Sequence, residues 1–164
     1  MVKASITATA FQLPARAVDC EAEMLVYGLG QMNDFPHLKT PSNAGFRPDF
    51  LPLLDTAKRL IDLPENWDSY GASPIDPRLI EYGLSLLNEL TPSQTPLPTM
   101  VPTSRGGIQL EWHCRDIDLE IRIESLGSLD VSFEDSRTLE EWDGELTTSL
   151  EPLHRFLAEL SRRA

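Results

Sequence analysis

The chain has 164 residues, of which 41% are hydrophobic, and its mean hydropathy is -0.23. This composition is typical of one globular domain with its own core, and it argues against a disordered chain or one that spans a membrane. The net charge of -12, from 26 acidic and 14 basic side chains, argues against binding to nucleic acids or to anionic membranes, which attract clustered lysine and arginine.

Residues 1–48 show the weakest pattern, and we expect them to belong to the same domain as the core at 49–164. A weak alternation favours a strand over residues 4–13. Asp19 is a candidate N-cap of a helix that ends near Gly28, and prolines and small polar residues after it predict a loop. The first residues lack the apolar segment of a secretory signal, and the two cysteines have no metal-binding or redox spacing. These features favour a cytoplasmic protein with both thiols free.

The middle of the chain predicts two helices followed by an extended segment. Apolar residues at three- and four-residue spacing predict one helix over 50–62 and another that runs to Leu90. The second helix has a clear start, because Asp76 can serve as its N-cap and Pro77 suits the first helical position. The four prolines within 91–104 predict an extended segment that leads into the next elements.

Three consecutive runs after the prolines have apolar side chains at every second position. They lie at 108–112, 119–123 and 129–133, and they predict an antiparallel meander of at least three strands. We therefore expect an α+β fold in which helices pack on the apolar face of this sheet. The opposite face should be wet and strongly negative, because residues 107–145 contain twelve acidic residues and three arginines.

The C-terminal segment predicts an amphipathic helix. Because proline is tolerated only in the first turn, Pro152 places the start of the helix near Ser149, after a short helical turn capped at 138–141. We expect the helix to lie across the apolar face of the sheet, although its leucines could instead mediate self-association. These leucines are Leu146, Leu150, Leu153, Leu157 and Leu160.

The connector between the two middle helices is rich in residues that form tight turns. Asn66 and Asp68 can fold back on their own backbone, and Gly71 can adopt a positive φ. Trp67 and Tyr70 can then cover the junction of helix and sheet as a structural corner. The alternative is that these two residues and Asp68 form a recognition patch for a partner.

Two motifs carry a resemblance to a group of proteins. They are Asn66-Trp67-Asp68-Ser69-Tyr70-Gly71-Ala72 and Gly106-Gly107-Ile108-Gln109-Leu110-Glu111-Trp112. With these motifs, residues 60–135 resemble a group of small uncharacterised bacterial proteins in which an Asn-Trp-Asp-x-Tyr-Gly-Ala segment precedes a Gly-Gly-x-x-Leu-Glu-Trp strand. The resemblance implies no established reaction. It implies an origin in small accessory gene modules, in which antitoxin-like roles are common.

The chain contains none of the common nucleophile, phosphate-loop, dinucleotide or zinc motifs. The sequence therefore favours a non-enzymatic acidic module, without cofactor or metal, that binds a basic protein as the antitoxin-like or immunity-like member of a bacterial pair. The acidic residues would steer the partner, and the aromatic residues would anchor it. The expected partner-binding residues are Trp67, Asp68, Tyr70, Glu111, Glu120, Glu124 and Glu134.

Two other functions stay open at this stage. Pairing Leu110 with Leu119 would place Glu111 opposite Asp118 on the outer face, and such a pair could bind Mg²⁺ or Ca²⁺ in a metal-dependent hydrolase. The second alternative is a module that self-associates into a homo-oligomer through the sheet edge or the leucine seam.

Overall fold

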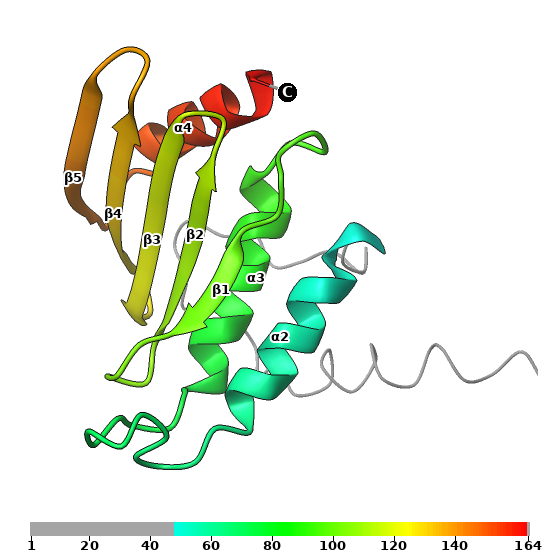
Figure 1. Ribbon diagram of the computed structural model, residues 1–164, viewed down its shortest axis with the longest axis vertical. Coiled ribbons are helices and arrows are strands. Elements are labelled where there is room, and N and C mark those ends of the chain that lie inside the picture. Colours follow the sequence, from blue (N-terminus) through cyan, green and yellow to red (C-terminus); the bar gives the residue numbers. More distant parts are fainter. Residues whose placement is uncertain (1–47, 164) are drawn as a thin grey trace, which may run out of the picture. The chain divides into compact units, whose positions relative to one another are not determined.

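The structure is a computed structural model that describes residues 48–163. The strand and helix expected within residues 1–47, and Cys20, lie outside the described residues. The described part has an α+β fold with a five-stranded antiparallel meander, and its strands follow one another in chain order across the sheet (Figure 1). The strands are β1 (Thr99–Pro102), β2 (Ile108–Cys114), β3 (Ile117–Ser125), β4 (Ser128–Asp135) and β5 (Glu140–Leu146).

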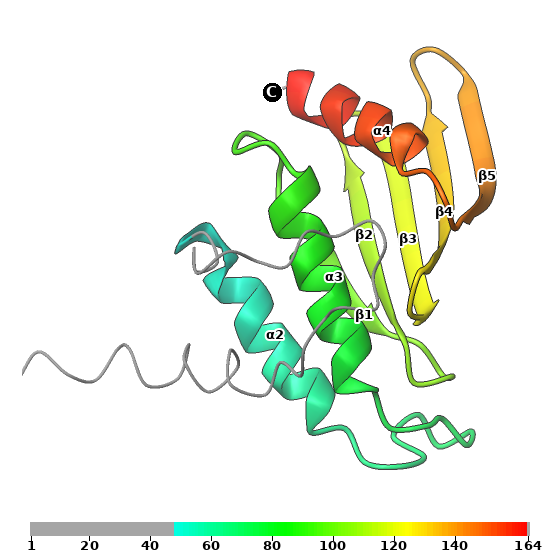
Figure 2. The same ribbon diagram turned by 180° about the vertical axis from the view of Figure 1, so that it is seen from behind.

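Three helices lie on the same face of the sheet, as the views from both sides show (Figures 1 and 2). They are α2 (Leu51–Ile61), which follows the short 3-10 helix η1 (Pro48–Phe50), α3 (Pro77–Leu90) and α4 (Glu151–Arg162). This arrangement confirms the predicted packing of helices on the apolar face. Among the described residues, no helix is long and apolar enough to cross a membrane.

The core lies between the sheet and these helices. The apolar residues at every second position of β2, β3 and β4 point inward and are buried, as the alternation in the sequence predicts. Helix α3 approaches β2 and β3 closely, because a Cβ atom at Gly83 would lie 2.8 Å from Cδ1 of Ile108 and 3.2 Å from Cδ1 of Ile123. A glycine at this position therefore allows the helix backbone to sit directly on the sheet.

The predicted start of α3 is confirmed. Asp76 is the N-cap, and its carboxylate accepts a hydrogen bond of 2.9 Å from the backbone N–H of Arg78. Pro77 occupies the first helical position, where its missing N–H costs no hydrogen bond. The proline-rich segment after α3 also contributes to the core, because the indole N–H of Trp112 donates to the carbonyl oxygen of Pro96 at 2.7 Å.

Helix α4 packs on β4 and β5 through aromatic rings. Phe156 stacks on Phe133 with ring centroids 4.1 Å apart, and it also contacts Trp142 at 5.5 Å. The helix starts two residues after the predicted start, and the Ser149 hydroxyl accepts the backbone N–H of Glu151 at 3.3 Å. The leucines of its predicted seam are buried or half-buried, so this seam is part of the core of the described chain.

Two strands were not predicted, and one predicted element is wrong. The segment 138–141 does not form a helical turn: its first half closes the β4–β5 connection, and its second half begins β5. The carboxylate of Asp135 explains the difference, because it accepts the backbone N–H groups of Arg137 at 2.9 Å and Thr138 at 3.3 Å and thereby folds a tight turn. Leu146, which was assigned to the helical seam, ends β5.

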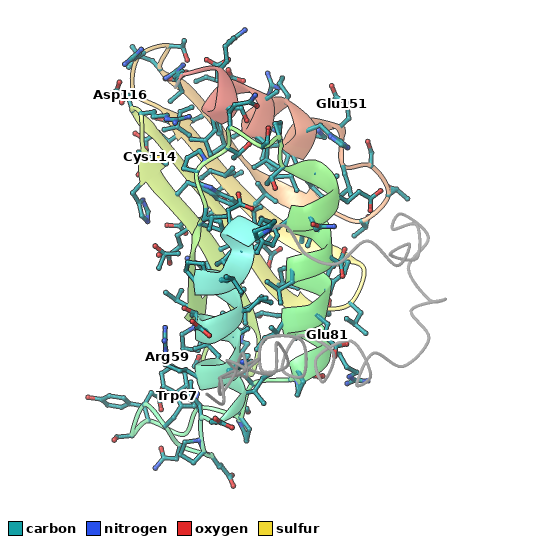
Figure 3. All side chains as sticks on the ribbon, turned by 90° about the vertical axis from the view of Figure 1, so that its right-hand side faces the viewer. Arg59, Trp67, Glu81, Cys114, Asp116 and Glu151 are labelled. Carbon is teal, nitrogen blue, oxygen red and sulfur yellow. The ribbon has the colours of Figure 1, made fainter. Side chains whose placement is uncertain are left out.

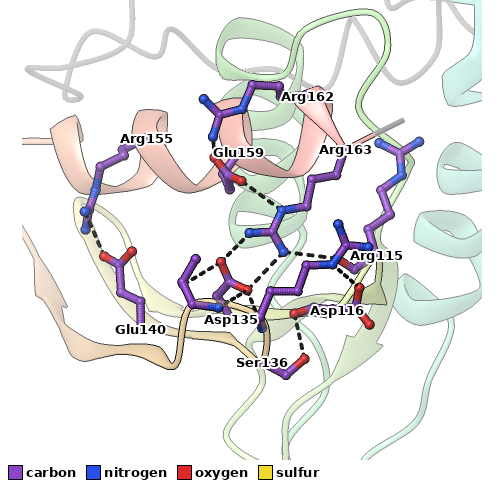
Figure 4. A network of polar contacts seen from close by, with 11 residues as sticks. Arg115, Asp116, Asp135, Ser136, Glu140, Arg155, Glu159, Arg162 and Arg163 are labelled. Carbon is purple, nitrogen blue, oxygen red and sulfur yellow. Dashed lines mark hydrogen bonds and ion pairs between the residues drawn. The ribbon is translucent and has the colours of Figure 1, made fainter.

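An ion pair between Asp135 and Arg163 connects the end of α4 to this turn (Figure 4). Asp135 is 2% exposed, and its two carboxylate oxygens accept two hydrogen bonds from the guanidinium group of Arg163, one of them at 3.0 Å. The Thr138 hydroxyl donates to the same carboxylate at 2.7 Å. Arg163 also donates to Glu159 at 2.8 Å and to the carbonyl oxygen of Arg115 at 3.3 Å. The pair therefore joins the helix, the β4–β5 turn and the β2–β3 turn.

We expect Asp135→Asn to lower the melting temperature by about 10 °C at neutral pH, because it removes the buried carboxylate that pairs with Arg163 and leaves Glu159 to balance the charge of this guanidinium group. Arg163 holds the pKa of Asp135 well below its usual value. A lowered pKa stabilises the folded state above the unfolded pKa of about 4, and this contribution is lost as the pH falls towards the folded pKa. The difference in melting temperature between the two proteins should therefore shrink below about pH 4. A difference that stays constant from neutral to acidic pH would contradict this role, and Asp130→Asn on the exposed face is the control.

Candidate functional site

The face of the sheet opposite the helices is densely acidic, and no element of the described chain covers it (Figures 1 and 2). We call it the outer face. Its charged residues alternate with the buried residues of β2–β5. Arg122 and His113 are its basic residues. Its nine acidic residues are Glu111, Asp118, Glu120, Glu124, Asp130, Glu134, Glu141, Asp143 and Glu145.

The pairing of β2 and β3 differs from the predicted register. Glu111 lies opposite Glu120, and Asp118 lies opposite His113, so the predicted Glu111–Asp118 pair is wrong. The reason is the length of the turn: β2 and β3 are connected by two residues, Arg115 and Asp116, which both have a φ of 60°. Positive φ at both central residues is the geometry of a tight hairpin turn, which is most often built from Asn and Gly.

A side-chain amide bridges the two facing glutamates. Gln109 donates from Nε2 to Oε1 of Glu111 at 2.9 Å and to Oε2 of Glu120 at 3.0 Å. Its carbonyl oxygen accepts a hydrogen bond of 3.1 Å from Nε of Arg122. Like charges directly opposite each other on a sheet destabilise it, and the hydrogen bonds from this amide offset part of that cost.

His113 extends this polar row on β2. Its Nδ1 lies 2.7 Å from Oδ1 of Asp118, and its Nε2 lies 3.6 Å from Oε2 of Glu111. The hydrogen bond with Asp118 raises the pKa of His113 above its usual value, and Glu111 adds to this effect. One ligand atom each from Glu111, His113 and Glu120 lie within 4.8 Å of one another, so these three side chains could share one metal ion.

A shallow hollow of about 230 Å³ lies in the outer face towards β4 and β5. Four of its lining side chains are acidic and one is basic, so it is a negatively charged depression in the sheet surface. The acidic lining residues are Glu120, Asp130, Asp143 and Glu145, and the basic one is Arg122. Its size and charge suit the end of a lysine or arginine side chain, which would make charge-assisted hydrogen bonds there.

The loop between α2 and α3 is held by its own polar side chains. The Asn66 side chain accepts the backbone N–H of Gly71 at 2.7 Å. The Asp68 carboxylate accepts the backbone N–H groups of Tyr70 at 2.7 Å and Ala72 at 3.1 Å. These contacts confirm the predicted turns at Asn66 and Asp68. The carboxylate of Asp68 is thus occupied within the loop.

The two aromatic residues of the loop have different environments. Trp67 is half-buried at the end of the loop near α2, and its indole N–H donates to the carbonyl oxygen of Ser73 at 3.2 Å (Figure 3). Tyr70 is 94% exposed. The predicted structural corner therefore holds for Trp67, whereas Tyr70 does not cover the junction and projects into solvent from a loop that its neighbours hold in place.

The residues that directly follow the first sequence motif lie against the start of the second motif. The backbone N–H of Ser73 donates to the carbonyl oxygen of Ser104 at 3.0 Å, and that of Asp76 donates to the carbonyl oxygen of Gly106 at 2.8 Å. A Cβ atom at Gly106 would lie 2.7 Å from the carbonyl oxygen of Pro74, so only glycine allows this approach. The motifs therefore form one structural unit that attaches the Tyr70 loop to the β1–β2 turn.

The structure places the predicted glutamates Glu111, Glu120, Glu124 and Glu134 together on the outer face, whereas Tyr70 lies on a loop at one end of the sheet. The acidic residues of β5 were missed, and the only signal for them was the charge count, because β5 lacks an apolar alternation. The Ser128 hydroxyl of β4 donates a hydrogen bond to the carboxylate of Glu145 on this face. Comparison of the chain with models of protein families, with curated proteins and with solved structures gives no match.

Proposed function

We propose that the protein is a non-enzymatic acidic module that binds a basic protein through the outer face, as the antitoxin-like or immunity-like member of a bacterial protein pair. The observation that carries this proposal is the charge of an uncovered sheet face with nine acidic residues and one arginine. A field of one sign on an open surface attracts a partner of opposite charge and accelerates its association.

The distribution of the charge supports a protein as the partner. Phosphate groups of nucleic acids and anionic lipids would be repelled by the outer face. Its acidic side chains are spread over β2–β5 rather than gathered around one deep cavity, and this suits a broad contact more than a small ligand. The sheet backbone is already ordered before binding, so that little backbone conformational entropy is lost when the partner docks.

A salt-dependent pull-down tests this function. We expect the tagged full chain to retain a basic protein from a lysate of the cells in which the protein occurs at about 0.1 M salt and to lose it at about 1 M. At the higher concentration, salt screens the attraction between exposed charges beyond about 3 Å. Retention of the same protein at both salt concentrations would show that the charged face does not drive binding. Recovery of no basic protein at low salt would contradict the proposal.

Tyr70 should serve as an anchor of this contact. We expect Tyr70→Ala to weaken binding of the recovered partner by about 30-fold, because a preordered and exposed aromatic ring is typical of residues that dominate interface energies. Isothermal titration at two salt concentrations separates this loss of affinity from the electrostatic attraction of the acidic residues. The loss caused by Tyr70→Ala should be the same at both salt concentrations. Trp67→Phe is the matched aromatic control on the same loop, and an equal loss for that variant, or none for Tyr70→Ala, would contradict the anchor role.

A metal-dependent hydrolase is the second candidate, favoured by the cluster of Glu111, His113 and Glu120. The corrected register changes the metal that this cluster suits. With a histidine among the ligands, Zn²⁺ or Mn²⁺ fits better than Mg²⁺ or Ca²⁺, which prefer oxygen ligands only. The contact between Nδ1 of His113 and Asp118 leaves Nε2 for a metal, and a carboxylate in this place commonly orients a metal-binding histidine.

Thermal unfolding with added metal tests the second candidate. If the cluster holds an ion, about 0.1 mM Zn²⁺ or Mn²⁺ should raise the melting temperature by several degrees, because binding to the folded state stabilises it. His113→Ala should abolish this shift, whereas Glu134→Gln, elsewhere on the outer face, should preserve it. An unchanged melting temperature in the wild-type protein would contradict a metal site.

A further inference from the structure

Within residues 48–163, the free side of β5 is an open edge of the sheet. β5 is the last strand in the order and pairs with β4 alone among the described residues. Alternate residues of an edge strand point their backbone N–H and C=O groups away from the sheet, where another strand can pair with them. At seven residues, β5 is long enough to accept an added strand along its whole length.

The opposite edge of the sheet is a poorer place for such pairing. β1 has four residues and ends at Pro102, which has no backbone N–H to donate. Helix α2 also packs beside β1 (Figure 1). If a partner adds a strand to this sheet, the geometry therefore favours the β5 edge.

The charge of the β5 side chains determines which kind of added strand can pair with this edge. Glu141, Asp143 and Glu145 occupy alternate positions of β5, and all three are exposed on the outer face. A second copy of β5 would bring carboxylates opposite carboxylates, which destabilises a pair of strands. A strand with lysine or arginine at every second position would instead form opposite-charge pairs along the whole edge.

The side chains on the inward face of β5 determine which residues suit the other alternate positions of an added strand. Trp142 is half-buried there and lies over Gly144, whose added Cβ would be 3.1 Å from the indole ring. Leu146 is buried at the end of the same face. Apolar side chains at the intervening positions of an added strand would extend this inward surface beside Trp142.

We propose that an extended segment of the basic partner binds the outer edge of β5 by strand addition, with basic and apolar residues in alternation. The proposal rests on the proposed function, since it names the way in which the basic partner docks. Backbone hydrogen bonds supply affinity in this mode, and the alternating side chains supply specificity. It also accounts for acidic residues on an edge strand, because they prevent pairing between copies and favour a basic strand.

The test uses a synthetic peptide of about nine residues that alternates lysine and valine, which is long enough to span the seven residues of β5. Two further peptides carry N-methyl groups on the backbone nitrogens, one at every valine and the other at every lysine. Each of these peptides loses the backbone N–H donors along one of its two edges but keeps the charge of its side chains. We expect fluorescence anisotropy to show that one methylated peptide binds the full chain at least about tenfold more weakly than the parent, while the other keeps most of its affinity. Bound parent peptide should also slow hydrogen exchange of β5 amides.

The outcomes separate this proposal from the proposed function. Equal binding of the three peptides, without slowed exchange in β5, would overturn strand addition but leave charge-driven binding to the outer face intact. Binding of none of the peptides, together with a salt-sensitive basic partner in the pull-down, would also overturn the edge proposal alone. If the pull-down recovers no basic protein, the proposed function fails, whatever the peptides show.

Discussion

The triple variant Glu120→Lys, Asp130→Lys and Asp143→Lys should bind the basic partner about 100-fold more weakly than the wild-type protein at about 0.1 M salt. These three residues line the hollow in the outer face, and the change reverses its charge. Most of the loss should appear in the association rate, because long-range attraction becomes repulsion. Stopped-flow or surface-based kinetics at several salt concentrations would measure both rates.

A control with the same change of net charge distinguishes the outer face from the charge of the whole molecule. Asp55→Lys, Asp62→Lys and Glu89→Lys change exposed residues on or next to the helices, away from the outer face. We expect this control to reduce the association rate only a few-fold. Equal losses for the two triple variants would show that net charge, and not this face, governs binding.

Gly107→Ala should destabilise the fold by about 3 kcal/mol and lower the melting temperature by about 10 °C. A Cβ atom at Gly107 would lie 2.3 Å from the carbonyl oxygen of Ile123 and 3.0 Å from Cα of Glu124. Both are backbone atoms of β3, so no side-chain rotation can relieve the clash. The Gly-Gly motif is thus explained by the close approach of two backbones, and thermal or denaturant unfolding measures its contribution.

Gly127→Ala is the matched control for this prediction. Gly127 has a φ of 82°, but a Cβ atom there would meet nothing within 4 Å. The substitution should therefore cost only the strain of a left-handed conformation, about 1–2 kcal/mol. If Gly107→Ala proved as mild as Gly127→Ala, the packing of the motif against β3 would not be the reason for the glycine.

The parts of the fold that the sequence predicted are those with a strong local signal. Asp76 and Pro77 marked the start of α3, and the alternating apolar residues marked the three central strands. β5 was not predicted because its inward positions include Glu140 and Gly144, which interrupt the alternation of apolar residues. β1 is too short and contains Pro102, so that its pattern resembles an extended linker.

The candidate site was predictable to the extent that strand alternation determines which side chains share a face. Glu111, Glu120, Glu124 and Glu134 were placed on one face before their pairing was known. Their neighbours across the strands depend on register, and register depends on the turn. Arg115 and Asp116 both adopt positive φ in a two-residue turn, and no local sequence signal for such a turn is present, so the pairing of Glu111 with Glu120 was missed.

Site-specific photocrosslinking would locate the surface to which the basic partner binds. Ser132 lies between Glu120 and Asp143 on the outer face, and a photoreactive side chain there would contact any partner bound to this face. We predict that it crosslinks a basic protein at low salt, whereas the same group at Glu89 of α3 does not. Crosslinking of that protein from Glu89 but not from Ser132 would contradict binding to the outer face, because the partner would then contact the helical side of the molecule.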